Sequence, residues 1–91
     1  MLDGEKRINI PAELRELSNL KEVKKVILTT RGEDILFIPY SEENLEEVKV
    51  YGIRAVDSKG RVVLPPVFVR MSSEWEVYLL NGEILATRHI F

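Results

Sequence analysis

Short apolar runs bounded by turn residues recur along the chain, and their length and β-branched residues predict β-strands. Near the C-terminus, Glu76 to Leu80 and Glu83 to Arg88 flank Asn81-Gly82, a dipeptide typical of tight hairpins. Upstream, the runs 53–56 and 61–64 flank Asp-Ser-Lys-Gly, where Asp suits the first and Gly the last position of a type I turn. The pattern therefore predicts two hairpins in this part of the chain.

The N-terminal part repeats the same plan. LDGEKRINIP at 2–11 and VDSKGRVVLP at 56–65 each have an Asp, an Arg four residues on and a Pro four beyond that, 54 positions apart. Arg31-Gly32 also matches Asn81-Gly82 at an offset of 50, and an apolar run follows each. Because a repeat is the strongest organising signal in a sequence, we divide one domain into three segments: repeat 1 at 1–40, a joint at 41–50 and repeat 2 at 51–91.

Helical patterns are confined to short segments. Residues 11–20, PAELRELSNL, begin with Pro and an acidic first turn and space three leucines by three, which predicts a short amphipathic helix. The counterpart PPVFVRMSSE at 65–74 predicts a loop or a single turn, because its prolines and valines disfavour a helix. In the joint, Ser41 is a suitable N-cap for a linking helix with an acidic first turn.

Two hairpin-rich halves, each too small for a core of its own, predict a mainly β fold in which one small barrel closes about a pseudo-twofold axis. One or two short helices complete the expected fold. Only Met1 and Leu2 precede Asp3, so the opening strand of repeat 1 is either truncated or supplied from elsewhere, with 48–52 as one candidate. Hairpins exchanged between the halves and hairpins kept within each half have the same hydrophobic pattern, so the sequence leaves both open.

Composition narrows the function. The chain has 91 residues, 45% hydrophobic and 31% charged, which is typical of a soluble globular domain. No apolar run approaches the roughly 20 residues of a membrane span, and a cytoplasmic location is the expectation. Without cysteine, with His89 as the single histidine and with no Gly-rich phosphate loop or nucleophile motif, we expect no enzyme, no metal and no other cofactor.

The repeated phrase resembles a known family. Asp3 to Arg7, Ile10-Pro11 and Leu14-Arg15 are similar to the AbrB/SpoVT superfamily of DNA-binding transcription factors, which includes MraZ and the MazE antitoxin. The resemblance covers most of both halves. It implies a cradle-loop barrel built from two copies of the motif, and a fused pair in one chain also resembles the related archaeal barrels, including the RIFT type.

In that family, basic residues of the turn and of the following helix contact DNA. The resemblance therefore implies a transcriptional regulator that binds duplex DNA, with no membrane partner, no small-molecule substrate and scope for homo-oligomers. The residues implied as DNA contacts are Lys6, Arg7, Arg15, Lys59, Arg61 and Arg70. Arg70 matches the family's L-R pair only with a shift of one residue, because Phe68-Val69 stands at the offset of 54 from Leu14-Arg15 and Val69-Arg70 follows one residue later.

The Asp and Arg residues of the repeated phrase, and the aromatic residues, also have a purely structural interpretation. Asp57 can cap its turn, as Asp3 can in repeat 1, while Arg7 and Arg61 can pair with an acid or cover the end of the barrel. Trp75, Tyr78 and Phe68 fit packing in the core or at the rim of the barrel better than base stacking. If the arginines serve DNA alone, their removal is expected to weaken binding with little change in melting temperature.

The net charge of the chain favours an alternative to DNA binding. The net charge is −2 and the pI near 5.4, against a pI above about 9 for many nucleic-acid-binding domains. Residues 1–40 carry seven basic and seven acidic side chains, 41–50 one and four, and 51–91 five and four. The acidic excess therefore lies in the joint, and the halves are nearly neutral. Basic turns favour DNA binding; neutral halves favour a non-catalytic interaction or scaffold module that does not bind DNA.

Overall fold

A computed structural model of the chain describes residues 6–18, 20, 22–70, 74–82 and 84–90. The fold is mainly β, as the sequence predicts. In chain order, the elements of the described residues are β1 (Arg7–Asn9), α1 (Ala12–Leu17), β2 (Lys25–Arg31), β3 (Asp34–Pro39), α2 (Glu42–Glu47), β4 (Gly52–Ala55), β5 (Arg61–Val63), α3 (Pro66–Val69), β6 (Trp75–Leu80) and β7 (Ile84–His89).

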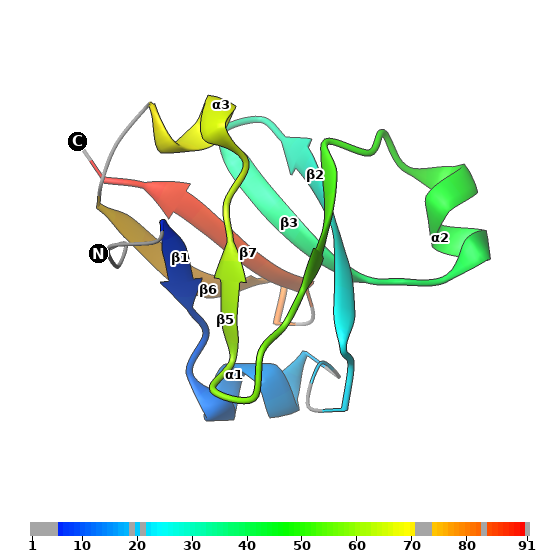
Figure 1. Ribbon diagram of the computed structural model, residues 1–91, viewed down its shortest axis with the longest axis horizontal. Coiled ribbons are helices and arrows are strands. Elements are labelled where there is room, and N and C mark those ends of the chain that lie inside the picture. Colours follow the sequence, from blue (N-terminus) through cyan, green and yellow to red (C-terminus); the bar gives the residue numbers. More distant parts are fainter. Residues whose placement is uncertain (1–5, 19, 21, 71–73, 83, 91) are drawn as a thin grey trace.

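The strands form two antiparallel sheets. The larger has the order β4-β2-β3-β7-β6, and the smaller is a ribbon of β1 and β5 (Figure 1). Buried side chains from both sheets belong to one hydrophobic core: Ile8 and Val62 come from the ribbon, and Leu28, Phe37 and Leu85 come from the larger sheet. The ribbon is thus packed on the sheet by its inner face.

The two hairpins around Arg31-Gly32 and Asn81-Gly82 are confirmed, as β2–β3 and β6–β7. Gly32, Asn81 and Gly82 all have positive φ angles, 64°, 55° and 74°, which tight hairpin turns require and which Gly and Asn adopt at the least cost. Turn chemistry therefore specified these two hairpins locally.

The predicted hairpin of 53–56 with 61–64 is wrong. Its turn forms, with an Asp57 N–H donating to the Arg61 carbonyl at 3.1 Å, but β4 pairs with β2 and β5 pairs with β1. Beyond the turn the two arms bond to other parts of the chain: Val56 N–H donates to the Lys24 carbonyl, just before β2, at 2.8 Å, and Leu64 N–H to the Lys6 carbonyl, just before β1, at 3.1 Å. The tip is local, whereas its two arms belong to different sheets.

The closed barrel is also not found. Among the described residues, the larger sheet has β4 at one edge and β6 at the other, and the ribbon strands, three residues each, do not join these edges by a hydrogen-bonded ladder. Nor are there only one or two helices: the single turn predicted at 65–74 is present as α3, after Pro65, and is the third helix of the described residues.

The two repeats pair around common centres. Ile8 lies opposite Val62, its equivalent at the offset of 54, and Leu36 lies opposite Ala86, its equivalent at the offset of 50. On either side of the Ile8–Val62 pair, Ile10 N–H donates to Gly60 at 2.9 Å and Leu64 N–H donates to Lys6 at 3.1 Å. An approximate local twofold axis therefore passes through both pairs.

The halves are interleaved around this axis. β4 belongs to repeat 2 but pairs with β2 of repeat 1, with Ile27 opposite Ile53, and Tyr51 N–H extends the ladder by donating to Leu28 at 2.8 Å. Segment 48–52, the candidate for the opening strand of repeat 1, thus contributes only Tyr51 and Gly52 to the pairing with β2. Neither half contains all the strands of the sheet to which it belongs.

The helices of the first half and the joint are confirmed as α1 and α2. On α1, Leu14 is half-buried but Leu17 is 56% exposed, so only part of the predicted apolar stripe faces the core. Ser41 caps α2, because its Oγ accepts a hydrogen bond from Asn44 N–H at 3.0 Å. No helix in the described part of the chain is long and apolar enough to cross a membrane.

Candidate nucleic-acid interface

The outer face of the β1–β5 ribbon carries two of the predicted arginines. Successive residues of a strand point to opposite faces, so the buried Ile8 and Val62 leave Arg7, Arg61 and their cross-strand neighbours on the other face. Arg7 lies opposite Val63 and Arg61 lies opposite Asn9. The local twofold axis therefore relates the two arginines across the ribbon.

Asp57 holds this pair of arginines. Its Oδ1 accepts hydrogen bonds from the backbone N–H of Lys59 at 2.9 Å and of Arg61 at 2.8 Å. Its Oδ2 lies 2.7 Å from Arg61 Nε and 3.7 Å from Arg7 Nη1. The backbone N–H of Arg61 is the main cause that lowers the pKa of the Asp57 carboxyl, and the Arg61 side chain and Lys59 N–H add to it. The turn-capping interpretation of Asp57 is confirmed.

Two lysines flank the ribbon. Lys59 is exposed at the tip of the turn between β4 and β5, and Lys6 is exposed just before β1. Lys6 has a φ of 62°, the left-handed conformation that its equivalent Gly60 adopts at 77°. The predicted Asp3, which would complete the symmetry of the turns, lies outside the described residues.

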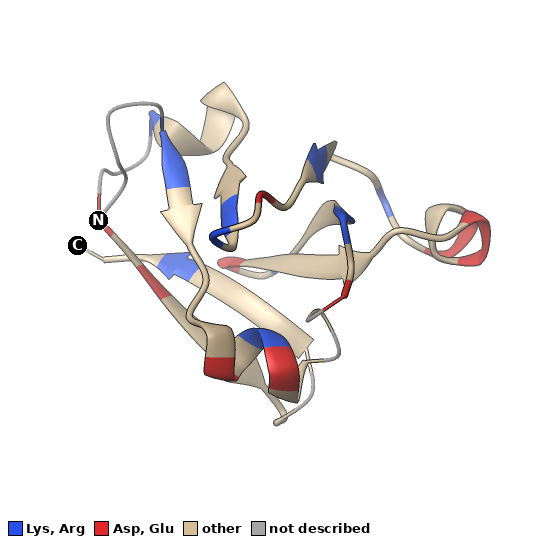
Figure 2. Cartoon of the chain, turned by 60° about the horizontal axis from the view of Figure 1, so that its bottom comes forward, with Lys and Arg blue, Asp and Glu red and all other residues tan. Residues whose placement is uncertain are grey.

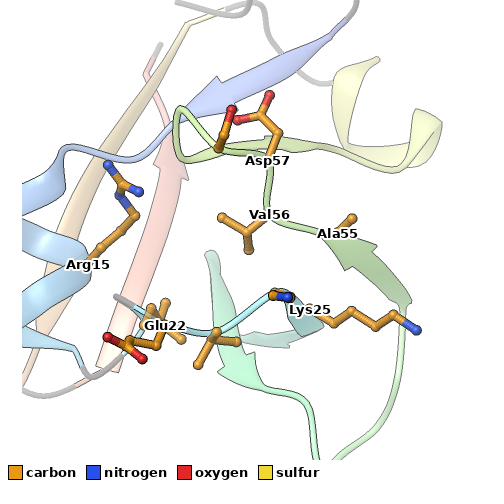
Figure 3. A pocket seen from close by; sticks show the side chains of 10 residues that line it. Arg15, Glu22, Lys25, Ala55, Val56 and Asp57 are labelled. Atoms are coloured by element: carbon orange, nitrogen blue, oxygen red, sulfur yellow. The ribbon is translucent and has the colours of Figure 1, made fainter.

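Arg15 lies elsewhere, on α1, in the wall of a pocket of about 710 Å³ (Figure 3). Figure 3 shows its guanidinium reaching toward the turn that carries Asp57, with Val56 pointing into the pocket and Lys25 pointing away. A Cβ atom at Gly60 would lie 2.6 Å from Arg15 Cζ, so the guanidinium rests against that glycine. Among the described residues, the buried Arg15 Nε has no hydrogen-bond partner.

Arg70 and Lys6 come together in a second pocket, of about 360 Å³, beside α3. Arg54 of β4 joins them there. Arg54 was not among the predicted residues. The only signal for it in the sequence is a cation in the strand-like run that leads into the repeated phrase. The six predicted residues are therefore divided between the ribbon, the α1 pocket and the α3 pocket, with Lys6 next to both the ribbon and the α3 pocket.

Charge is distributed unevenly over the molecule (Figure 2). In residues 6–9 and 57–63 there are four cations, Lys6, Arg7, Lys59 and Arg61, against one carboxylate, Asp57. Figure 2 shows the acidic residues of α2 at the far end of the molecule from β1. The acidic joint therefore does not cancel the basic character of the ribbon locally.

A separate charged cluster lies on the larger sheet. Asp34 accepts hydrogen bonds from Arg88 Nε at 2.9 Å and from the Tyr78 hydroxyl. The Arg88 hydrogen bond is the main cause that lowers the pKa of the Asp34 carboxyl, followed by that of Tyr78. Burial, and then the Asp34 hydrogen bond, raise the pKa of Tyr78. Trp75 and Phe68 are buried, which confirms core packing for both.

No group of three His, Cys, Asp or Glu side chains in the described part of the chain is arranged to hold a metal ion. No protein-family model, curated protein or solved structure matches the chain. The resemblance to the AbrB/SpoVT superfamily therefore stays a prediction that rests on the quoted residues.

Proposed function

We propose that the protein binds duplex DNA through the outer face of the β1–β5 ribbon, as an AbrB-like regulator. The observation that carries the proposal is the pair of arginines, Arg7 and Arg61, placed symmetrically on one face of a two-stranded antiparallel ribbon. The major groove of B-DNA is about 12 Å wide and admits such a ribbon. A twofold arrangement of cations suits the two strands of a duplex.

Asp57 serves this interface as a positioning residue. It binds the Nε of Arg61, and an arginine keeps further N–H donors on its terminal nitrogens for a phosphate or a guanine edge. The same carboxylate offsets part of the positive charge of the two arginines. Sequence-independent affinity therefore depends strongly on Lys59 and Lys6, which are exposed beside the ribbon.

Because Arg7 and Arg61 form ion pairs with Asp57, replacing either arginine affects the stability of the fold as well as DNA binding. Side-chain exposure is 23% for Arg7 and 29% for Arg61, and both guanidinium groups lie against the carboxylate. Replacing either arginine removes a partner of Asp57 in the folded state, so a loss of stability is expected along with a loss of binding. Lys59, exposed at the turn tip, is the cleaner probe.

The test is a salt titration of binding to a labelled duplex of about 20 base pairs, long enough for two turns of the major groove. Binding at about 50 mM salt should weaken steeply as salt rises, with a log–log slope of about −0.9 for each phosphate contact. Lys59→Gln should reduce the magnitude of that slope by about 1. The matched control is Lys49→Gln, the same charge change on the exposed segment after α2.

Absence of binding at about 50 mM salt would overturn the proposal and favour the interaction module. Equal losses in Lys59→Gln and Lys49→Gln would show that binding depends on overall charge and not on the ribbon. Circular dichroism of both variants establishes that each is folded.

A further inference from the structure

The wall of the pocket beside α3 is almost entirely apolar, and three cationic side chains help to line it. Val63, Leu64 and Val69 contribute apolar surface, while Lys6, Arg54 and Arg70 come from three separate segments around it. No carboxylate lines the pocket among the described residues. A pocket lined by three cationic side chains and, as far as the described residues go, by no acidic one favours an anion.

The twofold relation of the repeats shows how this space arises. At the offset of 54, Val69 is the equivalent of Arg15, and Lys6 is the equivalent of Gly60. In repeat 1 the space is filled from within, because the Arg15 guanidinium rests against Gly60, where a Cβ atom would lie 2.6 Å from its Cζ. Repeat 2 has the shorter Val69 there, so the corresponding space beside α3 is open.

The exchange of residues also changes the charge of the site. Glu16 of α1 corresponds to Arg70 after α3, so an acid is replaced by a cation at the same place in the repeat. Arg54, which also lines the pocket, donates a hydrogen bond from its Nη1 to the Ile53 carbonyl at 3.0 Å, which orients its guanidinium. The surroundings of the α3 pocket therefore differ in charge from the corresponding place in repeat 1.

We infer that the α3 pocket binds a small amphipathic anion, a carboxylate carried on an apolar chain or ring. The carboxylate would accept charge-assisted hydrogen bonds from Arg54 and Arg70, with Lys6 adding its charge. The apolar body would cover Val63, Leu64 and Val69 and remove their surface from water. A volume of about 360 Å³ lies at the small end of ligand pockets, so the ligand is small.

The experiment is a heteronuclear NMR titration of the full chain with octanoate, in the absence of DNA, so that its outcome is independent of the proposed function. Saturable shift changes should centre on Val63, Leu64, Val69 and Arg70, with a Kd on the order of 1 mM for so small a ligand. Octan-1-ol, which lacks the charge, should have a Kd at least about tenfold higher than that of octanoate. Inorganic phosphate, which lacks the apolar body, should also bind more weakly.

A substitution tests whether the cationic side chains of the pocket bind the carboxylate. Arg70 is exposed, so Arg70→Gln should fold normally, which its own spectrum verifies, and should weaken octanoate binding about tenfold by loss of a charged hydrogen bond. Lys24→Gln, an exposed cation that lines the other pocket, is the matched control and should leave the Kd unchanged.

Three results would overturn the inference. Octan-1-ol or phosphate equal to octanoate would show that the site does not recognise an amphipathic anion. Shift changes that do not saturate, or that centre on the Arg15 pocket, would place binding elsewhere. An unchanged Kd in Arg70→Gln would show that this cation does not contribute to binding the carboxylate.

Discussion

At the scale of single residues, equivalent positions of the two repeats have the same backbone but different side-chain duties. Gly60 and Lys6 both have left-handed φ angles, 77° and 62°, beside the same pair of strands. Gly60 lies against an arginine side chain, because a Cβ atom there would lie 2.6 Å from Arg15 Cζ. The residue type at this position therefore reflects the space that Arg15 needs and the local conformation together.

Gly60→Ala tests that interpretation. Its Cβ would lie 2.6 Å from Arg15 Cζ and 2.9 Å from the Ile10 carbonyl oxygen. The arginine can swing away, but Ile10 is bound to the ribbon backbone, so we expect a loss of about 2–4 kcal/mol in the free energy of unfolding, from strain and contact together. Gly32→Ala is the control, because Gly32 has a φ of 64° and open space around it.

Gly32→Ala should cost only about 1 kcal/mol, the penalty for the left-handed conformation alone. Urea unfolding of both variants measures the difference. Equal losses would mean that the crowding at Gly60 is relieved without cost.

Asp34 gives a prediction in pH. It is 6% exposed, and the Arg88 guanidinium and the Tyr78 hydroxyl lower the pKa of its carboxyl in the folded protein. A lowered folded pKa contributes stability that is fully present above the unfolded pKa of about 4 and is lost as pH falls through the folded value. The acid limb of the stability curve should therefore depend on this residue.

Asp34→Asn removes the charged acceptor and should lower the free energy of unfolding at pH 7 by about 1–3 kcal/mol. The deficit relative to the parent should shrink below about pH 4, because the parent loses the same charge there. Urea unfolding at pH 7, 4 and 2 measures it, with Glu46→Gln on the exposed face of α2 as the control. A deficit that stays constant across this range would contradict the assignment to the Asp34 charge.

At the scale of elements, the features that short-range contacts determine are the ones that could be predicted from the sequence. The β2–β3 and β6–β7 hairpins and the Ser41 cap depend on contacts within a few residues, and each was predicted. The 57–60 turn was also predicted, but its two flanking strands pair with β2 and β1. A turn determines the direction of the chain, and partners elsewhere determine the pairing.

The predicted site residues lie in three different places for the same reason: partners far along the chain determine where each residue comes to lie. Repetition placed Arg7, Lys59 and Arg61 in equivalent turns, and the pairing of β1 with β5 brings them to one ribbon. Arg15 and Arg70 were assigned by similarity alone and line two different pockets. Arg54 carries no motif, and only the approach of β4 to α3 places it with Arg70.

At the scale of the whole molecule, the interleaved strands make the halves interdependent. β1 of repeat 1 pairs only with β5 of repeat 2 within the described strands, and β2 receives β4 from repeat 2. Repeat 1 therefore lacks part of its sheet without repeat 2, and the reverse also holds.

Fragments 1–50 and 51–91 test this interdependence. The cut falls in the exposed connection between α2 and β4, where Val50 and Tyr51 are each 40% exposed. Each fragment alone should show no cooperative thermal transition, because its share of the core has no cover, and an equimolar mixture should recover the circular dichroism of the intact chain. A cooperative transition in either fragment alone would contradict the interleaved pairing.

The amino-acid sequence by itself determined the mainly β character, the turn positions, the short helices of the first half and the joint, and the existence of two repeats. These depend on side-chain periodicity and on turn and cap chemistry, which act between near neighbours. Only the tertiary structure decided which strands pair, that the described sheets do not close into a barrel, and which cations share a surface. Those features depend on pairing Ile8 with Val62, 54 residues away, and on burying both in a core shared with the larger sheet, and many pairings satisfy the same local pattern.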